Sequence, residues 1–139
     1  MQIILSDHNC EGHANTIFEA LKIHGFFPTF AMKLITFEQA GLHPKASDRE
    51  VWNFCQERGY LLLTGNRTAD DGTKSLEHVI HAFVKADSLP VITIGNLRRV
   101  MADPDYCFQC AENLAEIVLD LDELRGTTRL YIPVRAVGR

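Results

Sequence analysis

The chain lacks the features of a membrane or secreted protein. None of its apolar runs approaches the roughly 20 residues of a bilayer-spanning helix, and no cationic segment followed by a short apolar run resembles a leader peptide. Basic charge is also scarce, because 14 Lys and Arg residues face 18 Asp and Glu residues, which gives a net charge of −4. We therefore expect a soluble, cytoplasmic protein with no membrane partner, in which any binding of nucleic acid depends on a local basic patch.

Cysteine is sparse as well, and its spacing does not indicate a disulfide framework. A chain of 139 residues, 46% of them apolar, can build one core without covalent cross-links. We expect a single domain over residues 1–139, with a short basic tail at about 135–139, and reduced thiols. Cys107 and Cys110 form a CxxC pair, but a structural zinc site needs a second pair, and only His78 and His81 have similar spacing. Packing inside helices is the favoured interpretation of both pairs. The remaining cysteines are Cys10 and Cys55.

Short apolar runs alternate with longer segments of helical periodicity along the whole chain. Buried strands are predicted at residues 2–6, 30–37, 60–64, 89–94 and 130–134. Helices are predicted at residues 12–24, 48–58, 75–85 and 103–125. Strands separated by helices imply right-handed crossovers, so we expect an α/β fold with a mainly parallel sheet covered by helices on both faces.

Polar residues follow the predicted strands at the point where each strand ends. Asp7 and Asn9 come after the first strand, Asn66 after the third and Asn96 after the fourth. Because ligands of such sheets bind beyond the carboxyl ends of the strands, these side chains are candidates for one shared site. Asp48 opens a helix and could add a carboxylate, so the sequence suggests a site for a hard cation.

Four segments together resemble the small PIN-like domains, relatives of the VapC-type toxin ribonucleases, and most closely a compact PIN-like group. The segments are Ile-Leu-Ser-Asp7-His-Asn9, Ser47-Asp48-Arg-Glu50-Val-Trp, Leu-Leu-Leu-Thr64-Gly-Asn66-Arg67 and Leu-Pro-Val-Ile-Thr-Ile94. The resemblance covers nearly the whole chain. It implies a three-layer α/β/α fold with a central parallel sheet, and a carboxylate cluster that binds Mg²⁺ or Mn²⁺ for the cleavage of RNA. An antitoxin protein and a second copy of the chain are further candidate partners.

Site residues are carried over from this resemblance position by position. Asp7 and Asp48 match the first two acidic positions, and Asn66 stands where the family usually has an aspartate. An amide still offers a carbonyl oxygen, but it removes a negative charge and weakens the attraction for a divalent cation. Asp70 and Asp71 follow closely and could supply the missing carboxylate. The catalytic set is then Asp7, Asp48 and Asn66, and the metal ligands are drawn from Asp7, Asp48, Asp70 and Asp71. Candidates for contact with the substrate are Asn9, Arg67, Lys74, Arg98 and Arg99.

Ordinary structural roles compete with these assignments. Asp7 could cap the helix that follows it, and Asp48 and Glu50 fit the capping box that begins at Ser47. The segment Thr64-Gly-Asn66 has the composition of a turn.

Two further functions stay open beside the ribonuclease. A degenerate PIN-like domain would bind RNA or a protein without cleavage, and Asn66 favours that alternative. A phosphatase of the haloacid-dehalogenase kind ranks last, because Asn9 stands where that family has its general acid, and an amide cannot do that work.

Overall fold

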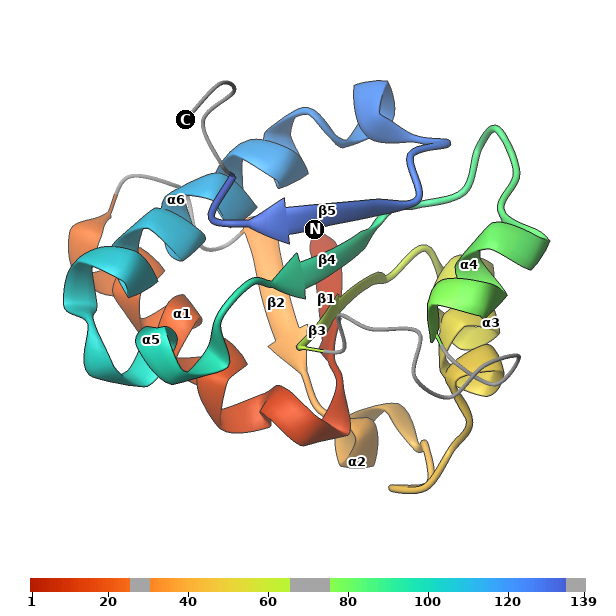
Figure 1. The fold of residues 1–139 in the computed structure, drawn as a ribbon, viewed down its shortest axis with the longest axis horizontal. Coiled ribbons are helices and arrows are strands. Elements are labelled where there is room, and N and C mark those ends of the chain that lie inside the picture. The colour runs from red at the N-terminus through yellow and green to blue at the C-terminus, as the bar shows by residue number, and fades with distance from the viewer. Residues whose placement is uncertain (26–30, 66–75, 135–139) are drawn as a thin grey trace.

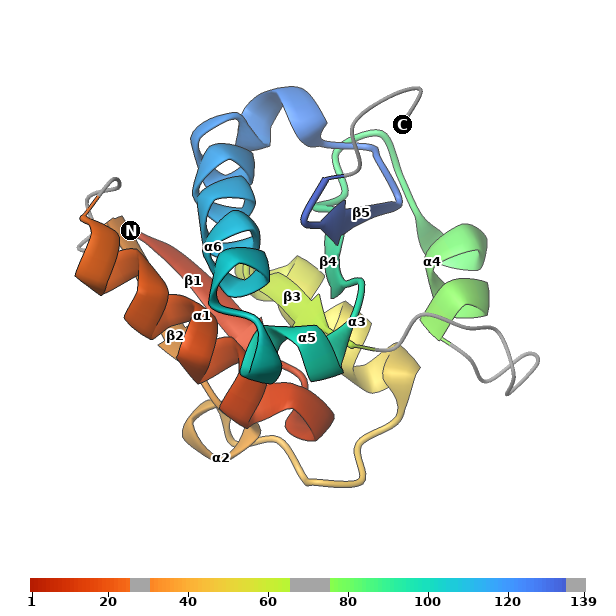
Figure 2. The ribbon, with the colours of Figure 1, turned by 60° about the vertical axis from the view of Figure 1, so that its left-hand side comes forward.

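A five-stranded sheet lies between two layers of helices (Figures 1 and 2). The computed structural model describes residues 1–25, 31–65 and 76–134. The strands are β1 (Gln2–Ser6), β2 (Met32–Ile35), β3 (Leu61–Thr64), β4 (Val91–Ile94) and β5 (Arg129–Ile132). The helices are α1 (Glu11–His24), α2 (Phe37–Ala40), α3 (Asp48–Arg58), α4 (Leu76–Phe83), α5 (Leu97–Ala102) and α6 (Pro104–Leu119), with the 3-10 turns η1 (His8–Cys10) and η4 (Leu121–Leu124).

The sheet has the strand order β2-β1-β3-β4-β5, and all of its strand pairs are parallel. The expected α/β fold with helices on both faces is thereby confirmed, with a sheet that is entirely parallel. From β1 the chain passes to β2 on one side and then returns to β3 on the other. The strand order therefore reverses between β1 and β3, and in such sheets ligands bind at this point, outside the carboxyl ends of the strands.

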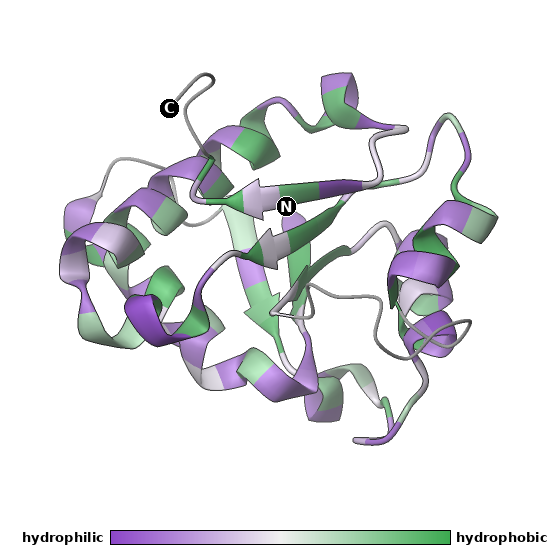
Figure 3. Ribbon diagram, viewed as in Figure 1, coloured by the Kyte–Doolittle hydropathy of each residue, from purple (hydrophilic) through white to green (hydrophobic). Residues whose placement is uncertain are grey.

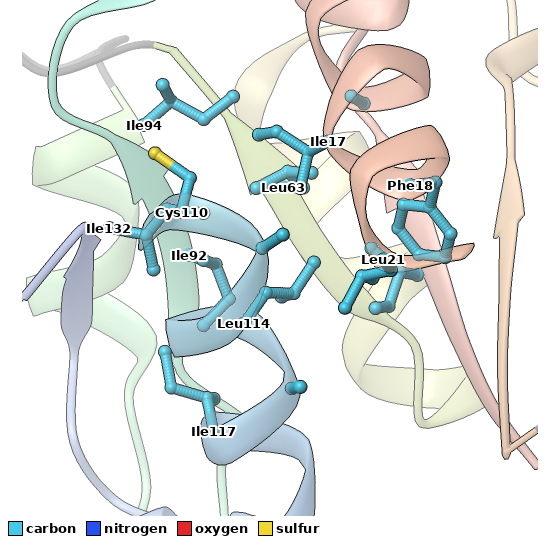
Figure 4. Packing of buried hydrophobic residues seen from close by; sticks show 14 of the residues in the cluster. Ile17, Phe18, Leu21, Leu63, Ile92, Ile94, Cys110, Leu114, Ile117 and Ile132 are labelled. Carbon is cyan, nitrogen blue, oxygen red and sulfur yellow. The ribbon is translucent and has the colours of Figure 1, made fainter. Parts of the chain in front are cut away.

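The two central strands β3 and β4 are buried along their whole length, which explains their unbroken apolar sequence. One face of the sheet packs against α1 and α6 through Leu63 and Ile92, as Figure 4 shows. The other face packs Leu62 against residues of α3 and α4, among them Trp52. In Figure 3 the strands are mostly hydrophobic, whereas the helices alternate between hydrophobic and hydrophilic residues. Trp52 is thus a core residue, as its sequence context predicts.

Most helix ends follow the predicted signals. Ser47 caps α3 in a capping box, and Gly59 ends that helix in the left-handed conformation at φ 70°. Asp103 caps α6 through the amides of Asp105 and Tyr106. None of the described helices is both long enough and apolar enough to cross a membrane.

Two segments differ from the sequence-based prediction. The predicted strand at 30–37 ends earlier, at Ile35, because Thr36 and Gln39 form a capping box that starts α2. No helix was predicted directly after the fourth strand, but Asn96 caps a short one there, α5, by accepting a hydrogen bond from the Arg99 amide at 3.1 Å. In both places a polar side chain satisfies free amides of a helix start and so outweighs the apolar character of its neighbours.

Candidate functional site

Asp7 and Thr64 meet where the strand order of the sheet reverses. The amide of Asp7 donates to the carbonyl of Leu63 at 2.8 Å and so continues the pairing of β1 with β3 by one residue. The hydroxyl of Thr64, which is completely buried, donates to Oδ2 of Asp7 at 2.7 Å. The half-buried carboxylate is therefore held in one orientation at the edge of the sheet.

This carboxylate is not used as a helix cap. Asp7 precedes η1, but its side chain forms no capping hydrogen bond there. Among the described residues, no Lys or Arg forms a salt bridge with it. The capping role that the sequence allowed for Asp7 is therefore not the role of its carboxylate.

The charge of Asp7 acts on both helical layers of the fold. Burial raises the pKa of the Cys10 thiol to about 11, and the negative charge of Asp7 contributes to that rise. Burial likewise raises the pKa of Cys55, in α3, to about 12, again with a contribution from Asp7.

Asp48 and Glu50 occupy the first turn of α3. Glu50 closes the capping box, since its amide donates to Ser47 Oγ at 3.1 Å and its Oε1 accepts from the Ser47 amide at 3.2 Å. Glu50 therefore has the structural role that the sequence favoured. Asp48 is half-buried and lies one and two helical turns before Val51 and Cys55, which face the sheet. Because α3 leads directly into β3 and runs opposite to it, Asp48 lies at the same edge of the sheet as Asp7. A cavity shared by the two carboxylates stays a prediction.

Thr64 and Glu11 were not predicted from the sequence as site residues. Thr64 was predicted to end the strand at 60–64 or to begin a turn, but it was not predicted as a site residue. A polar residue that ends a fully buried strand is the signal that could have identified it. Glu11, at the start of α1, pairs with His8 at 3.5 Å and accepts a hydrogen bond from the Phe37 amide at 3.4 Å. Glu11 thus links the start of α1 to the start of α2.

The predicted substrate-contacting residues that the structure describes lie on two different elements, η1 and α5. Asn9 is exposed on η1, and Arg98 and Arg99 are exposed on α5. Arg99 is engaged with its own helix end, through Asp103 at 3.0 Å, and lies 4.3 Å from the Tyr106 ring. Arg98 lines a cavity of about 370 Å³ at the ends of β3 and β4, here called the strand-end hollow. Five further candidates lie outside the described residues: Asn66, Arg67, Asp70, Asp71 and Lys74.

The donor chemistry at this edge fits a hard, water-retaining cation. Asp7 offers carboxylate oxygens, and Mg²⁺ binds to proteins through one or two carboxylates while it keeps several water molecules. Within residues 1–25, 31–65 and 76–134, no group of three or more His, Cys, Asp and Glu side chains is placed to hold a metal.

The CxxC pair belongs to the core. All four cysteines are free and buried, as expected for reduced thiols. Burial raises the pKa of Cys110 to about 12 and also raises that of Cys107. A buried thiol that stays protonated is a poor metal ligand and a poor nucleophile, so the packing interpretation accounts for this pair.

Comparison of the chain with protein-family models, with curated proteins and with solved structures finds no match. The functional inference therefore depends on the site itself.

Proposed function

We propose that the chain is a metal-dependent ribonuclease of the PIN-like type. The main support is the Asp7 carboxylate, held by the Thr64 hydroxyl at the point where the order of an all-parallel sheet reverses. The strand order is compatible with a PIN-like domain. A carboxylate at this position, used neither as a cap nor in a described salt bridge, suits the binding of a divalent cation.

Each residue at the edge has a distinct role in this proposal. Asp7 would hold Mg²⁺ or Mn²⁺, and Thr64 would keep its carboxylate in the binding orientation. Asp48 would complete the ligand set or hold a water molecule, together with Asn66, Asp70 or Asp71. When bound, the ion lowers the pKa of a water nucleophile and neutralises charge that builds up on the phosphate. Arg67 and Lys74 are candidates for contact with the RNA backbone.

The proposal includes a toxin–antitoxin pair. A toxin ribonuclease must be kept inactive by a protein partner, and a homodimer is a further proposed assembly. We expect induced expression of the chain alone to arrest growth of a bacterial host, and expression of Asp7→Asn to leave growth unchanged. Equal growth with both chains would remove the toxin from the proposal without affecting the ribonuclease.

A degenerate PIN-like domain, which binds RNA or a protein without cleavage, is the second candidate. It is favoured by the described residues, among which no group of three metal ligands converges, and by the amide at Asn66. Such a protein would still bind single-stranded RNA, but added Mg²⁺ or Mn²⁺ would not lead to cleavage.

The test is cleavage of end-labelled, single-stranded RNA by the purified chain, with Mg²⁺, with Mn²⁺ and with a chelator. We expect cleavage that needs the metal and is lost in Asp7→Asn, with circular dichroism unchanged. Asp122→Asn is the matched control, because Asp122 is exposed and precedes β5, at the opposite edge of the sheet. Cleavage that survives the chelator or the Asp7→Asn change would refute the proposal, and intact RNA that remains bound would favour the degenerate domain.

A further inference from the structure

The strand-end hollow lies at the same edge of the sheet as Asp7. Its residues come from the ends of β3 and β4 and from the start of α5: Gly65, Ile94, Gly95, Asn96, Leu97 and Arg98. Gly65 directly follows Thr64, the residue that holds Asp7. Figures 1 and 2 show α5 beside α1, close to the ends of these two strands. A volume of about 370 Å³ lies in the range of small-molecule sites.

Part of the lining of the hollow is apolar, and the position of its one partly exposed apolar side chain, Leu97, depends on a glycine. Ile94 is completely buried, and Leu97 packs against the same core cluster. A Cβ on Gly65 would lie 2.6 Å from Leu97 Cδ1, so only glycine lets the leucine side chain lie this close to the end of β3. The backbone of Gly65 and Gly95 adds polar groups to this apolar surface.

Among the described residues that line the hollow, Arg98 is the charged one. Its neighbour Arg99 is engaged with Asp103 and Tyr106. Both arginines are exposed and lie on the same short helix. The guanidinium of Arg98 is therefore available to an anionic group that enters the hollow, and a planar guanidinium suits a phosphate.

We propose that the strand-end hollow binds one nucleotide unit of the RNA strand, next to the phosphodiester at Asp7. Arg98 contacts the phosphate of this unit, and the partly exposed side chain of Leu97 lies against its sugar or base. An inorganic phosphate would contact the Arg98 guanidinium but not the side chain of Leu97, whereas a nucleotide contacts both. This inference rests on the proposed ribonuclease function and adds where the strand continues beyond the cleaved bond.

The first experiment tests occupancy without cleavage. Amide chemical shifts are followed by nuclear magnetic resonance while a nucleoside monophosphate, a short single-stranded RNA with chelator present, or inorganic phosphate is added. We expect shifts at Gly65, Gly95 and Asn96 with both nucleotide probes. These shifts should be lost in Arg98→Gln and kept in Arg125→Gln. Absence of shifts with both nucleotide probes would overturn the inference. Shifts with inorganic phosphate as large as those with the nucleotide probes would overturn it too.

The second experiment uses the cleavage reaction. Arg98→Gln should raise KM for RNA about tenfold, leave kcat nearly unchanged, and lower the dependence of binding on salt by about one unit of slope. Arg98→Lys should retain most of the affinity, and Arg125→Gln should behave as the unchanged chain, because Arg125 precedes β5 at the opposite edge of the sheet. If RNA is cleaved and the two arginine variants are indistinguishable, the hollow is not the nucleotide site although the ribonuclease stands. If no metal-dependent cleavage occurs but the nucleotide shifts are present and depend on Arg98, the ribonuclease fails and the nucleotide site stands.

Discussion

Thr64 and Asp7 are 57 residues apart in the chain and are joined by a hydrogen bond of 2.7 Å between Thr64 Oγ1 and Asp7 Oδ2. Thr64 is completely buried, so little water competes for the carboxylate oxygen that it engages. A buried donor to a carboxylate fixes its orientation, as the outer partners of metal ligands commonly do. The pair thus couples the end of β3 to the proposed metal ligand after β1.

Removal of the Thr64 hydroxyl should weaken the binding of the metal ion that cleavage requires. In Thr64→Val we expect the Mn²⁺ concentration for half-maximal RNA cleavage to rise about 10- to 100-fold, because the orienting donor of Asp7 is lost. A metal titration of the cleavage rate measures this, with circular dichroism to verify folding. Thr64→Ser keeps the hydroxyl and should stay near the unchanged chain. An unaltered metal requirement in Thr64→Val would show that the hydroxyl does not position Asp7.

The buried ion pair between α4 and β5 should contribute to stability. Arg129 is 4% exposed, and its Nε lies 3.3 Å from Oε1 of Glu77, which is 28% exposed. Glu77→Gln should lower the free energy of unfolding by about 2 kcal/mol, less than for a fully buried pair, because Glu77 reaches solvent. Urea denaturation measures the loss. Asp122→Asn, at a side chain that is 95% exposed, should change it by less than about 0.5 kcal/mol. Losses of equal size would contradict this interpretation.

Two glycine-to-alanine changes should have opposite signs. Gly126 has φ +90°, and a Cβ there would lie 2.7 Å from the backbone oxygen of Ala86, so Gly126→Ala should destabilise the fold by about 1–3 kcal/mol. Gly12 lies in α1 with open space around its Cα, so Gly12→Ala should stabilise the fold by about 0.5–1 kcal/mol. Thermal and urea unfolding of both variants provide the measurement. Equal signs would mean that backbone conformation is not what separates the two positions.

Thiol chemistry should distinguish core cysteines from a redox pair. All four cysteines are buried, and burial raises the pKa of Cys55 and Cys110 to about 12. A chromogenic disulfide reagent at about pH 8 should leave the folded protein unreacted, because thiolate is the reacting form. In denaturant all four thiols should react. Rapid reaction of two thiols in the folded protein would favour a redox role for Cys107 and Cys110.

Acid should weaken the start of α6 through Asp103. The Arg99 guanidinium, followed by the Tyr106 amide, lowers the pKa of the Asp103 carboxyl. Since this pKa is lower in the folded chain than in the unfolded chain, the stabilisation is present above the ordinary carboxyl range and is lost as pH falls through the lowered value. Thermal unfolding from about pH 5 to about pH 2 should therefore show a smaller acid dependence in Asp103→Asn. Parallel curves for the two proteins would rule out this contribution.

Much of the architecture could be predicted from local patterns. The apolar runs that became β1, β3 and β4, the capping box at Ser47 and the stop at Gly59 all appear in the sequence, because they depend on neighbouring residues. The end of β2 was predicted too late in the chain, because Thr36 and Gln39 form a capping box inside what looks like an apolar strand.

The site was only partly predictable for the same reason. A carboxylate after the first strand and polar residues after the later strands can be read from the sequence, and they suggested a common edge. The sequence could not distinguish Arg98 from Arg99, because only the fold places Asp103 and Tyr106 against one of them and the strand-end hollow beside the other.

Periodicity and capping signals act over a few residues, so the sequence alone determined the alternation of strands and helices and hence the parallel sheet between two helical layers. The tertiary structure decided which polar groups meet across that sheet. Strand order and register bring Thr64 beneath Asp7 and Arg129 to Glu77, and such contacts depend on side chains more than 50 residues apart. No local pattern encodes these contacts, because each one is fixed only when the whole sheet is assembled.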